Sequence, residues 1–127
     1  MDKLIAVAAR VLMAQIFIIA GCGKLTAYTA TAGYFSSLGI PMVGFALPLV
    51  ILVEVGGGLA LLVGFKTRWV AAVLAAFTVA SALIVHNNFA DQGQMIHFMK
   101  NLAMAGGLLL FVKYGAGELS IDEKMAK

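Results

Sequence analysis

The sequence predicts an all-α integral membrane protein, a four-helix bundle formed by a single domain of residues 1–127. The chain is 62% hydrophobic and only 12% charged, with a mean hydropathy of +1.00, whereas soluble domains are about half apolar and about a quarter charged. Its apolar runs are continuous rather than alternating, which excludes the strands of a β-barrel. Because each crossing takes about 20 residues, four helices nearly use up the chain.

The four spans are predicted at about residues 4–23, 43–64, 68–86 and 95–113. The first span ends at Gly23 and Lys24, because glycine and a cation are common at helix ends. Pro48 lies in the first turns of the second span, where its missing N–H costs little. Residues 26–41 are too polar to span the membrane, and they predict a short interfacial helix or an irregular loop.

The positive charges are distributed unevenly over the predicted loops. With four spans, both termini lie on one side of the membrane, together with seven of the nine Lys and Arg residues: Lys3, Arg10, Lys66, Arg68, Lys113, Lys124 and Lys127. Only Lys24 and Lys100 remain for the other side. This asymmetry predicts a multi-pass protein of the bacterial inner membrane with both termini in the cytoplasm. The cations form no basic stripe with interleaved aromatic residues, so no nucleic-acid partner is expected.

The N-terminal segment also has features of a lipoprotein signal that would end at Cys22. Arg10 and Gln15 interrupt its apolar run, which favours an uncleaved first membrane helix. Cys22 is the only cysteine, so a single chain has neither an internal disulfide nor a dithiol relay.

A carboxylate, Glu54, stands in the middle of the second predicted span, about 15 Å from either surface. A charge at this depth costs about 2.5 to 3.5 kcal/mol, so such residues usually face the interior and mark function. Glu54 shares a helical face with small residues, along which a neighbouring helix can approach closely. The first span carries a matching stripe of polar and small residues: Arg10, Ala14, Phe17, Gly21 and Lys24. These two stripes are predicted to meet in the bundle.

Two cations are candidate partners for Glu54. Arg10 lies roughly 9 Å deep, and a buried Arg10–Glu54 pair is the first hypothesis; the alternative is that Arg10 extends to the cytoplasmic interface. Lys100 approaches from the other side, beside Asn101, and His86 ends the third span at the same level. The candidate ligand-binding residues are therefore Arg10, Glu54, His86, Lys100 and Asn101.

This set predicts a particular kind of ligand. Two cations that share one anion leave a surplus positive charge, which attracts an anionic or carbonyl-bearing molecule, while imidazole and amide groups can hydrogen-bond it. The same groups could instead exchange protons. The histidines lack the spacing of metal-binding motifs, so no metal site is expected. No catalytic residue is assigned.

In order and spacing, several stretches resemble the DoxX family of small bacterial inner-membrane proteins. The matching stretches are AARVLMAQIFIIAGCGKL, YFSSLGIP, LVILVEVGGGLALLVGFKTR, HNNF and FMKNLAMAGGLLL. The resemblance implies a four-helix membrane bundle linked to membrane redox and stress systems. It therefore implies a quinone as ligand or a membrane redox protein as partner. No tightly bound cofactor is expected, because the sequence has no flavin or nucleotide motif and no haem-ligand pair. The family supplies no catalytic role for the five candidate residues.

The leading hypothesis is a quinone-linked or redox- and stress-associated accessory subunit with a buried polar ligand pocket. One alternative is an assembly subunit without a ligand, in which the buried charges only set helix register. Another is a small proton-coupled permease, which would need to be a homo-oligomer because four helices enclose little volume. A small-residue face is predicted to leave room for such association: Ala71, Ala75, Thr78 and Ala82.

Overall fold

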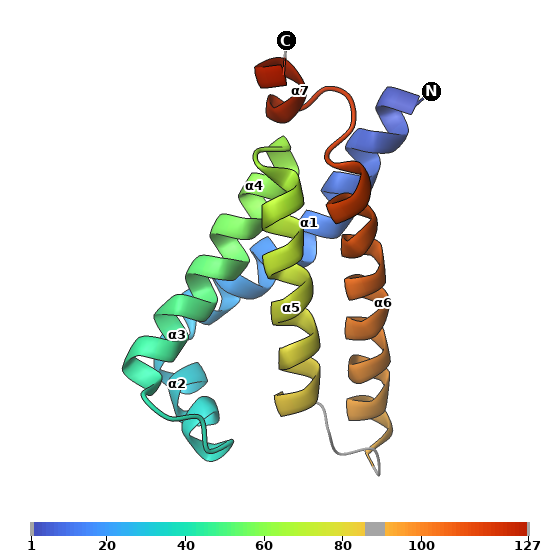
Figure 1. Ribbon diagram of the computed structural model, residues 1–127. Helices are drawn as coiled ribbons and strands as arrows, with labels where there is room; N and C mark the ends of the chain where they lie inside the picture. Colours follow the sequence, from blue (N-terminus) through green and yellow to red (C-terminus); the bar gives the residue numbers. More distant parts are fainter. Residues whose placement is uncertain (1, 86–90, 127) are drawn as a thin grey trace.

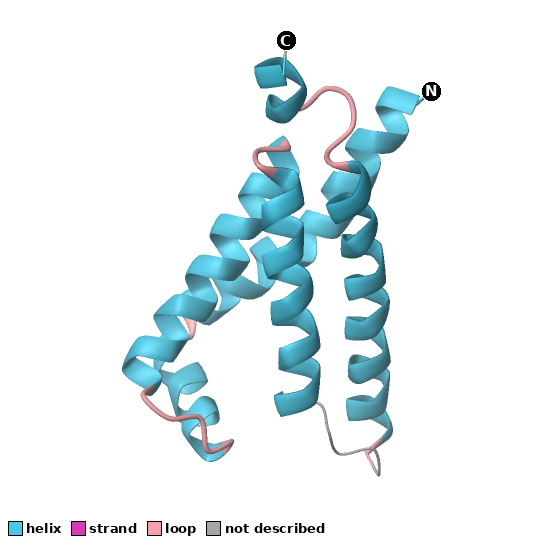
Figure 2. Ribbon diagram, viewed as in Figure 1, coloured by secondary structure: helices cyan, strands magenta, loops and turns pink. Residues whose placement is uncertain are grey.

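The computed structural model describes residues 2–85 and 91–126, and these residues form helices joined by short loops without any strand (Figures 1 and 2). Four helical segments are long and apolar enough to cross a membrane. They are α1 (Asp2–Thr26), the composite segment Val43–Val63, α5 (Thr67–Val85) and α6 (Gln92–Tyr114). The predicted all-α membrane bundle is therefore confirmed.

The second membrane segment is a composite of three pieces. It consists of α3 (Val43–Ile51), the π-helical turn η1 (Leu52–Gly56) and α4 (Gly57–Val63). The described residues also form two short helices, α2 (Tyr28–Ser37) and α7 (Ile121–Ala126). The segment between the first two spans is thus the short helix rather than the irregular loop, and the polar C-terminal tail, for which no structure was predicted, carries a helix.

The membrane helices form two pairs. The segment from α3 to α4 packs along α1, while α5 packs along α6. Figure 1 shows both termini at one end of the bundle, which we call the terminal end, and α2 at the opposite, far end. Toward the far end the α3–α4 segment diverges from α5, so the bundle widens there.

Small residues allow α1 to approach the second segment closely. A Cβ on Gly21 would lie 2.5 Å from Val55 Cγ2 and 3.1 Å from the Glu54 Cβ. A Cβ on Gly58 would lie 2.7 Å from Ile18 Cγ1. Because real Cβ atoms do not tolerate contacts of 2.5–2.7 Å, the absence of a side chain at Gly21 and Gly58 is what permits this helix pair.

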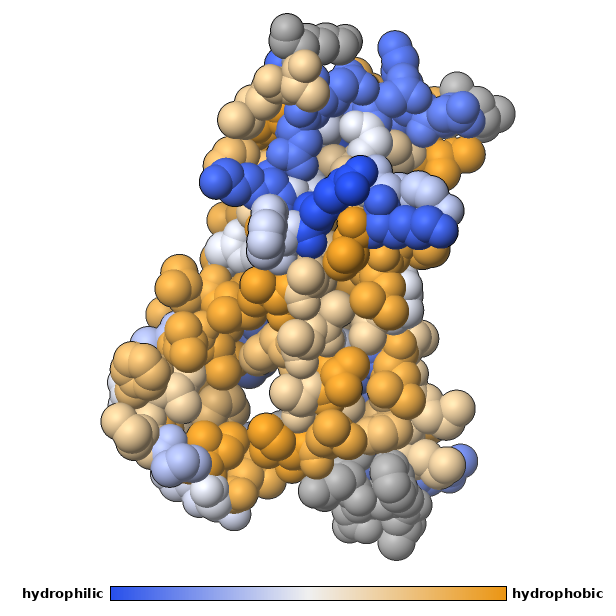
Figure 3. Space-filling model, viewed as in Figure 1, coloured by the Kyte–Doolittle hydropathy of each residue, from blue (hydrophilic) through white to orange (hydrophobic). Residues whose placement is uncertain are grey.

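The apolar core lies where all four membrane segments meet, and it consists of Ala14, Phe17, Leu61, Ala71, Leu74, Ala75 and Leu108. Large apolar side chains such as Leu12 and Leu52 point outward, 69% and 67% exposed, as expected where lipid is the solvent. Figure 3 shows hydrophobic side chains over the middle of the molecule and hydrophilic ones gathered at the terminal end.

The small-residue face predicted to support association lies inside the bundle instead. Ala71, Ala75, Thr78 and Ala82 are each at most 7% exposed. They face inward because α5 packs against α6 along this side, with Ala71 and Ala75 in the shared core. This face is therefore not available to a second copy of the chain.

Candidate functional site

The buried carboxylate of Glu54 is paired with Lys24. The Lys24 Nζ lies 2.8 Å from Glu54 Oε1, and the two side chains are 26% and 7% exposed. Apart from this ammonium, no described residue supplies a hydrogen-bond donor to that oxygen. Lys24 follows Gly21 by one helical turn, so the close approach of α1 at Gly21 brings its ammonium to the carboxylate.

The predicted ion pair between Arg10 and Glu54 is wrong, and among the described residues no ion pair joins Glu54 to Lys100 either. The Arg10 guanidinium turns to the terminal end, where it donates hydrogen bonds to backbone carbonyl groups. Nη2 lies 2.8 Å from the Leu119 oxygen and 3.2 Å from that of Glu118, and Nη1 lies 3.4 Å from the Leu62 oxygen. Arg10 thus points to the terminal end, the direction of the alternative hypothesis, but its guanidinium is buried beneath the tail, since Arg10 is only 2% exposed.

The backbone around Glu54 is irregular. Glu54 is the central residue of the π-helical turn η1, between the proline-containing α3 and the glycine-rich α4. A π-turn contains an extra residue compared with an α-turn, which changes the direction of the side chains that follow, and such turns are frequent at functional sites. Here the turn directs Glu54 to α1 and into the bundle.

A polar pocket of about 170 Å³ opens beside this ion pair. All four membrane segments contribute to it, with Lys24 from α1, Glu54 from η1, Ser81 from α5, and Lys100 and Asn101 from α6. The Asn101 side-chain amide donates a hydrogen bond to the Thr78 backbone oxygen over 3.4 Å, which holds α6 against α5. Because Glu54 lies midway along its span, the pocket lies deep in the membrane.

The pocket carries a surplus of positive charge. Two ammonium groups, from Lys24 and Lys100, face one carboxylate, from Glu54. Ammonium groups only donate hydrogen bonds, and an amide both donates and accepts them. The arrangement therefore suits a small group that accepts hydrogen bonds or carries negative charge.

Three of the five predicted site residues come together in this pocket, namely Glu54, Lys100 and Asn101. Arg10 is absent from it, and His86 lies outside the described residues. Lys24 was not among the predicted partners of Glu54, although its place on the Arg10-to-Lys24 stripe was the signal that it faces the second span. Ser81 carried no such signal, because a lone serine in an apolar helix is unremarkable.

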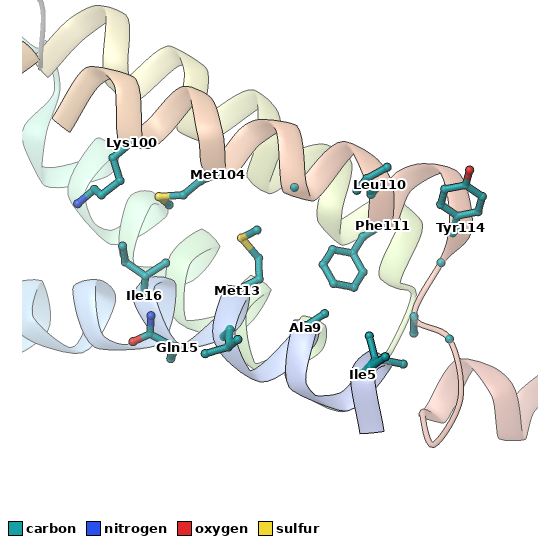
Figure 4. Close-up of a pocket in the computed structure, with 16 residues that line it drawn as sticks. Ile5, Ala9, Met13, Gln15, Ile16, Lys100, Met104, Leu110, Phe111 and Tyr114 are labelled. Carbon is teal, nitrogen blue, oxygen red and sulfur yellow. The ribbon is translucent and has the colours of Figure 1, made fainter. Parts of the chain in front are cut away.

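A second, larger space adjoins the polar pocket. We call it the α1–α6 groove; its volume is about 690 Å³, and Figure 4 shows Met13, Met104 and Phe111 projecting into it. Lys100 lies at one end and Ile5 and Tyr114 at the other. The groove and the polar pocket share three lining residues, Ile16, Lys100 and Met104.

The C-terminal tail closes the terminal end of the bundle. Asp122 of α7 accepts hydrogen bonds from the backbone N–H groups of Lys66 and Thr67, at 2.6 and 2.8 Å, and thereby caps α5. Its own N–H donates to the Gly64 oxygen. Burial by itself raises the pKa of the Asp122 carboxyl, but the hydrogen bonds from Thr67 and Lys66 and the charge of Arg10 outweigh it, so this pKa lies below its usual value.

Comparison with known proteins agrees with this architecture. The DoxX family model matches residues 5–87. The chain is 50% identical to the inner membrane protein YqjF of Escherichia coli (strain K12) over 119 residues, which are 94% of this chain and 90% of that protein. It is 34% identical over 121 residues to the inner membrane protein YphA of the same strain, covering 91% and 86% of the two chains. No solved structure matches. This protein therefore belongs to the DoxX family and is a multi-pass inner-membrane protein.

Proposed function

We propose that this protein binds a lipophilic molecule with a carbonyl-bearing head, such as a quinone, and serves as an accessory subunit of a membrane redox system. The observation that carries the proposal is the polar pocket, in which Lys24, Glu54, Lys100 and Asn101 surround a space of about 170 Å³ deep in the membrane. Intramembrane ionisable groups that line a cavity are costly to maintain and usually mark a ligand path.

The chemistry of the pocket supports a carbonyl-bearing head. Quinone oxygens accept hydrogen bonds, and they gain negative charge when the quinone is reduced, which the surplus ammonium group would stabilise. The bound molecule supplies the redox chemistry, while Lys100 and Asn101 orient its head. The chain itself has a single cysteine and therefore no dithiol relay of its own, so the electrons pass to or from a membrane redox partner.

The proposal includes an orientation. We expect both termini in the cytoplasm, because six of the eight Lys and Arg residues that the structure describes belong to the segments gathered at the terminal end. The polar pocket then lies between the core and the opposite surface of the membrane.

The test is to identify the molecules that copurify with the protein after gentle extraction from its own membrane. We expect native mass spectrometry and lipid extraction to find a quinone with the wild type, and the Lys100→Met variant to retain at least about tenfold less, because a charge-assisted hydrogen bond contributes about 1.5 to 3 kcal/mol. Lys113→Met is the matched control, since Lys113 is an exposed cation of the same helix outside the pocket.

Other outcomes would contradict the proposal. If the wild type retains no lipophilic molecule but does retain a larger protein, the Lys24–Glu54 pair is a packing device in an assembly subunit. If Lys100→Met and Lys113→Met retain the same amount of quinone as the wild type, the quinone binds elsewhere.

A further inference from the structure

We infer that the α1–α6 groove holds the hydrocarbon chain of a single-chain amphiphile whose head lies in the polar pocket. The inference rests on the proposed function for the head and adds the class of tail, its location and its route of entry. The two spaces are connected, because Ile16, Lys100 and Met104 line both of them. A molecule with its head at Lys100 therefore has its chain at the mouth of the groove.

The two spaces differ in chemistry in the way that the two ends of an amphiphile do. The polar pocket has two ammonium groups, a carboxylate and an amide. Beyond Gln15 and Lys100 the groove is lined by apolar side chains such as Ile5, Met13 and Phe111, up to Tyr114 at its far limit. Lys100 stands at the boundary, where an ammonium can reach the head while its methylene groups lie against the chain.

The dimensions of the groove favour one extended chain. From Lys100 to Tyr114 it runs along α6 for about 21 Å, at 1.5 Å per residue. Its volume of about 690 Å³ divided by this length gives a mean cross-section of about 33 Å². The tail segment Gly115–Gly117 closes the terminal end, so the chain enters sideways from the bilayer between α1 and α6.

A second copy of the chain fits this groove less well. A two-fold contact brings the same surface of both copies together, which would place Lys100 of each copy in one apolar interface and bury like charges. The groove is also concave, and two concave surfaces do not interdigitate. A hydrocarbon chain fills the groove without burying like charges and without the poor fit of two concave surfaces.

The test compares ligands that share one head and differ only in the tail: a ubiquinone with a long prenyl tail, decylubiquinone, and the same benzoquinone head without a tail. We expect the purified protein in detergent to bind the tailed ligands at least about tenfold more tightly than the tail-less head, because each buried methylene adds to affinity. Binding is measured by native mass spectrometry, which also reports the oligomeric state.

Two neighbouring glycines of α6 provide matched variants. A Cβ on Gly107 would lie 2.5 Å from Met13 Cε inside the groove, whereas a Cβ on Gly106 meets no atom within 4 Å. We expect Gly107→Leu to weaken tailed ligands about tenfold and to leave the tail-less head within about twofold of wild type. Gly106→Leu should change neither. Ala9→Leu and its control Ala8→Leu repeat the comparison from α1, where Ala9 lines the groove and Ala8 does not.

The outcomes separate this inference from the proposed function. Equal affinity for tailed and tail-less ligands would overturn the inference that the groove holds the tail, but it would not contradict the polar pocket as the site of the head. In another outcome, binding depends on the tail, Gly107→Leu abolishes it and Lys100→Met does not affect it. This result would support the groove as the site of the tail and overturn the polar pocket as the site of the head. Absence of all binding would overturn both. A dimer that Gly107→Leu abolishes would show that the groove is an interface between copies and would overturn the inference.

Discussion

The Lys24–Glu54 ion pair is the contact that makes a carboxylate tolerable at this depth. The carboxylate is almost fully buried, whereas the Lys24 side chain is 26% exposed. Removing one partner of a buried pair leaves the other charge without compensation, and this costs more when the remaining charge is the deeper one. The two single substitutions should therefore be unequal, which an ordinary surface salt bridge would not predict.

We predict that Lys24→Met destabilises the protein by about 3 kcal/mol and Glu54→Gln by less, because only the former leaves a buried charge unpaired. The double variant should be more stable than the sum of the two single losses of stability predicts, with a coupling free energy of about 1 to 3 kcal/mol. The measurement is the free energy of unfolding in mixed detergent micelles. Lys113→Met combined with Glu54→Gln is the control, and it should be additive. Equal coupling in both cycles would show that the Lys24 contact has no energetic role.

The packing of α1 against the second membrane segment depends on Gly21, and the nearby Gly23 provides a comparison. Gly21 is buried against Val55 and Glu54, whereas a Cβ on Gly23, two residues later, meets no atom within 4 Å. The two glycines belong to the same helix, but only position 21 is crowded by its neighbours. Alanine substitutions at the two positions therefore separate the effect of helix packing on stability from that of helix propensity. Gly21 also sets the distance from Lys24 to Glu54, since it lies one turn before Lys24.

We predict that Gly21→Ala and Gly23→Ala change stability in opposite directions. Alanine at position 21 forces α1 away from η1 and should cost about 1 to 3 kcal/mol. Alanine at position 23 should stabilise by about 0.5 to 1 kcal/mol through the lower entropy of the unfolded chain. Thermal unfolding in detergent distinguishes these outcomes. If both variants were stabilised, the close approach at Gly21 would not be a constraint on the bundle.

At the scale of the whole molecule, the two ends of the bundle are built differently. The terminal end is closed: Arg10 joins α1 and the end of α4 to the tail, and Asp122 fastens α7 to the turn before α5. Gly64 permits this packing, because a Cβ there would lie 2.4 Å from the Ser120 Cβ and 2.6 Å from Arg10 Nη1. Toward the far end the α3–α4 segment diverges from α5. The polar pocket lies on that side of the core, since Ala20, Lys24 and Ser81 line it. The tail thus clamps the two helix pairs together opposite the site.

We predict that this clamp weakens in acid. The pKa of Asp122 is lower in the folded protein than in the unfolded chain. The Asp122 carboxylate therefore stabilises the fold fully at a pH above its unfolded-state pKa of about 3.9, and this stabilisation is lost as the pH falls through its folded-state pKa. Amide hydrogen exchange of residues 118–126, corrected for the intrinsic rate, should show constant protection from pH 8 to about pH 5 and a loss below about pH 4.

Substitution of the carboxylate tests the same clamp at neutral pH. Asp122→Asn should lower the protection of the tail by about 1 kcal/mol, the usual cost of losing a helix cap, and remove most of its dependence on pH. Glu118→Gln is the control, because the backbone oxygen of Glu118, and not its carboxylate, bonds to Arg10. A wild-type tail whose protection is unchanged down to pH 3 would contradict this role of Asp122.

Much of the bundle followed from the sequence. The continuous apolar runs led to four membrane helices, and the polar and small stripe of α1 was correctly placed inside, since Arg10, Ala14, Phe17 and Gly21 are buried. Glu54 was correctly predicted to face inward. These features are local, because helix periodicity and the cost of a charge in lipid act on each segment by itself.

Only the tertiary structure decided which groups meet. Lys24 rather than Arg10 reaches Glu54, because the close approach at Gly21 brings the far end of α1 to η1, and a distance across two helices is not encoded in the periodicity of either. Arg10 instead finds backbone carbonyl groups more than 100 residues away, in a tail that shows no apolar pattern. The sequence determined which side chains must be buried, and the packing of the helices determined their partners, since burial is a property of one segment and pairing a property of several.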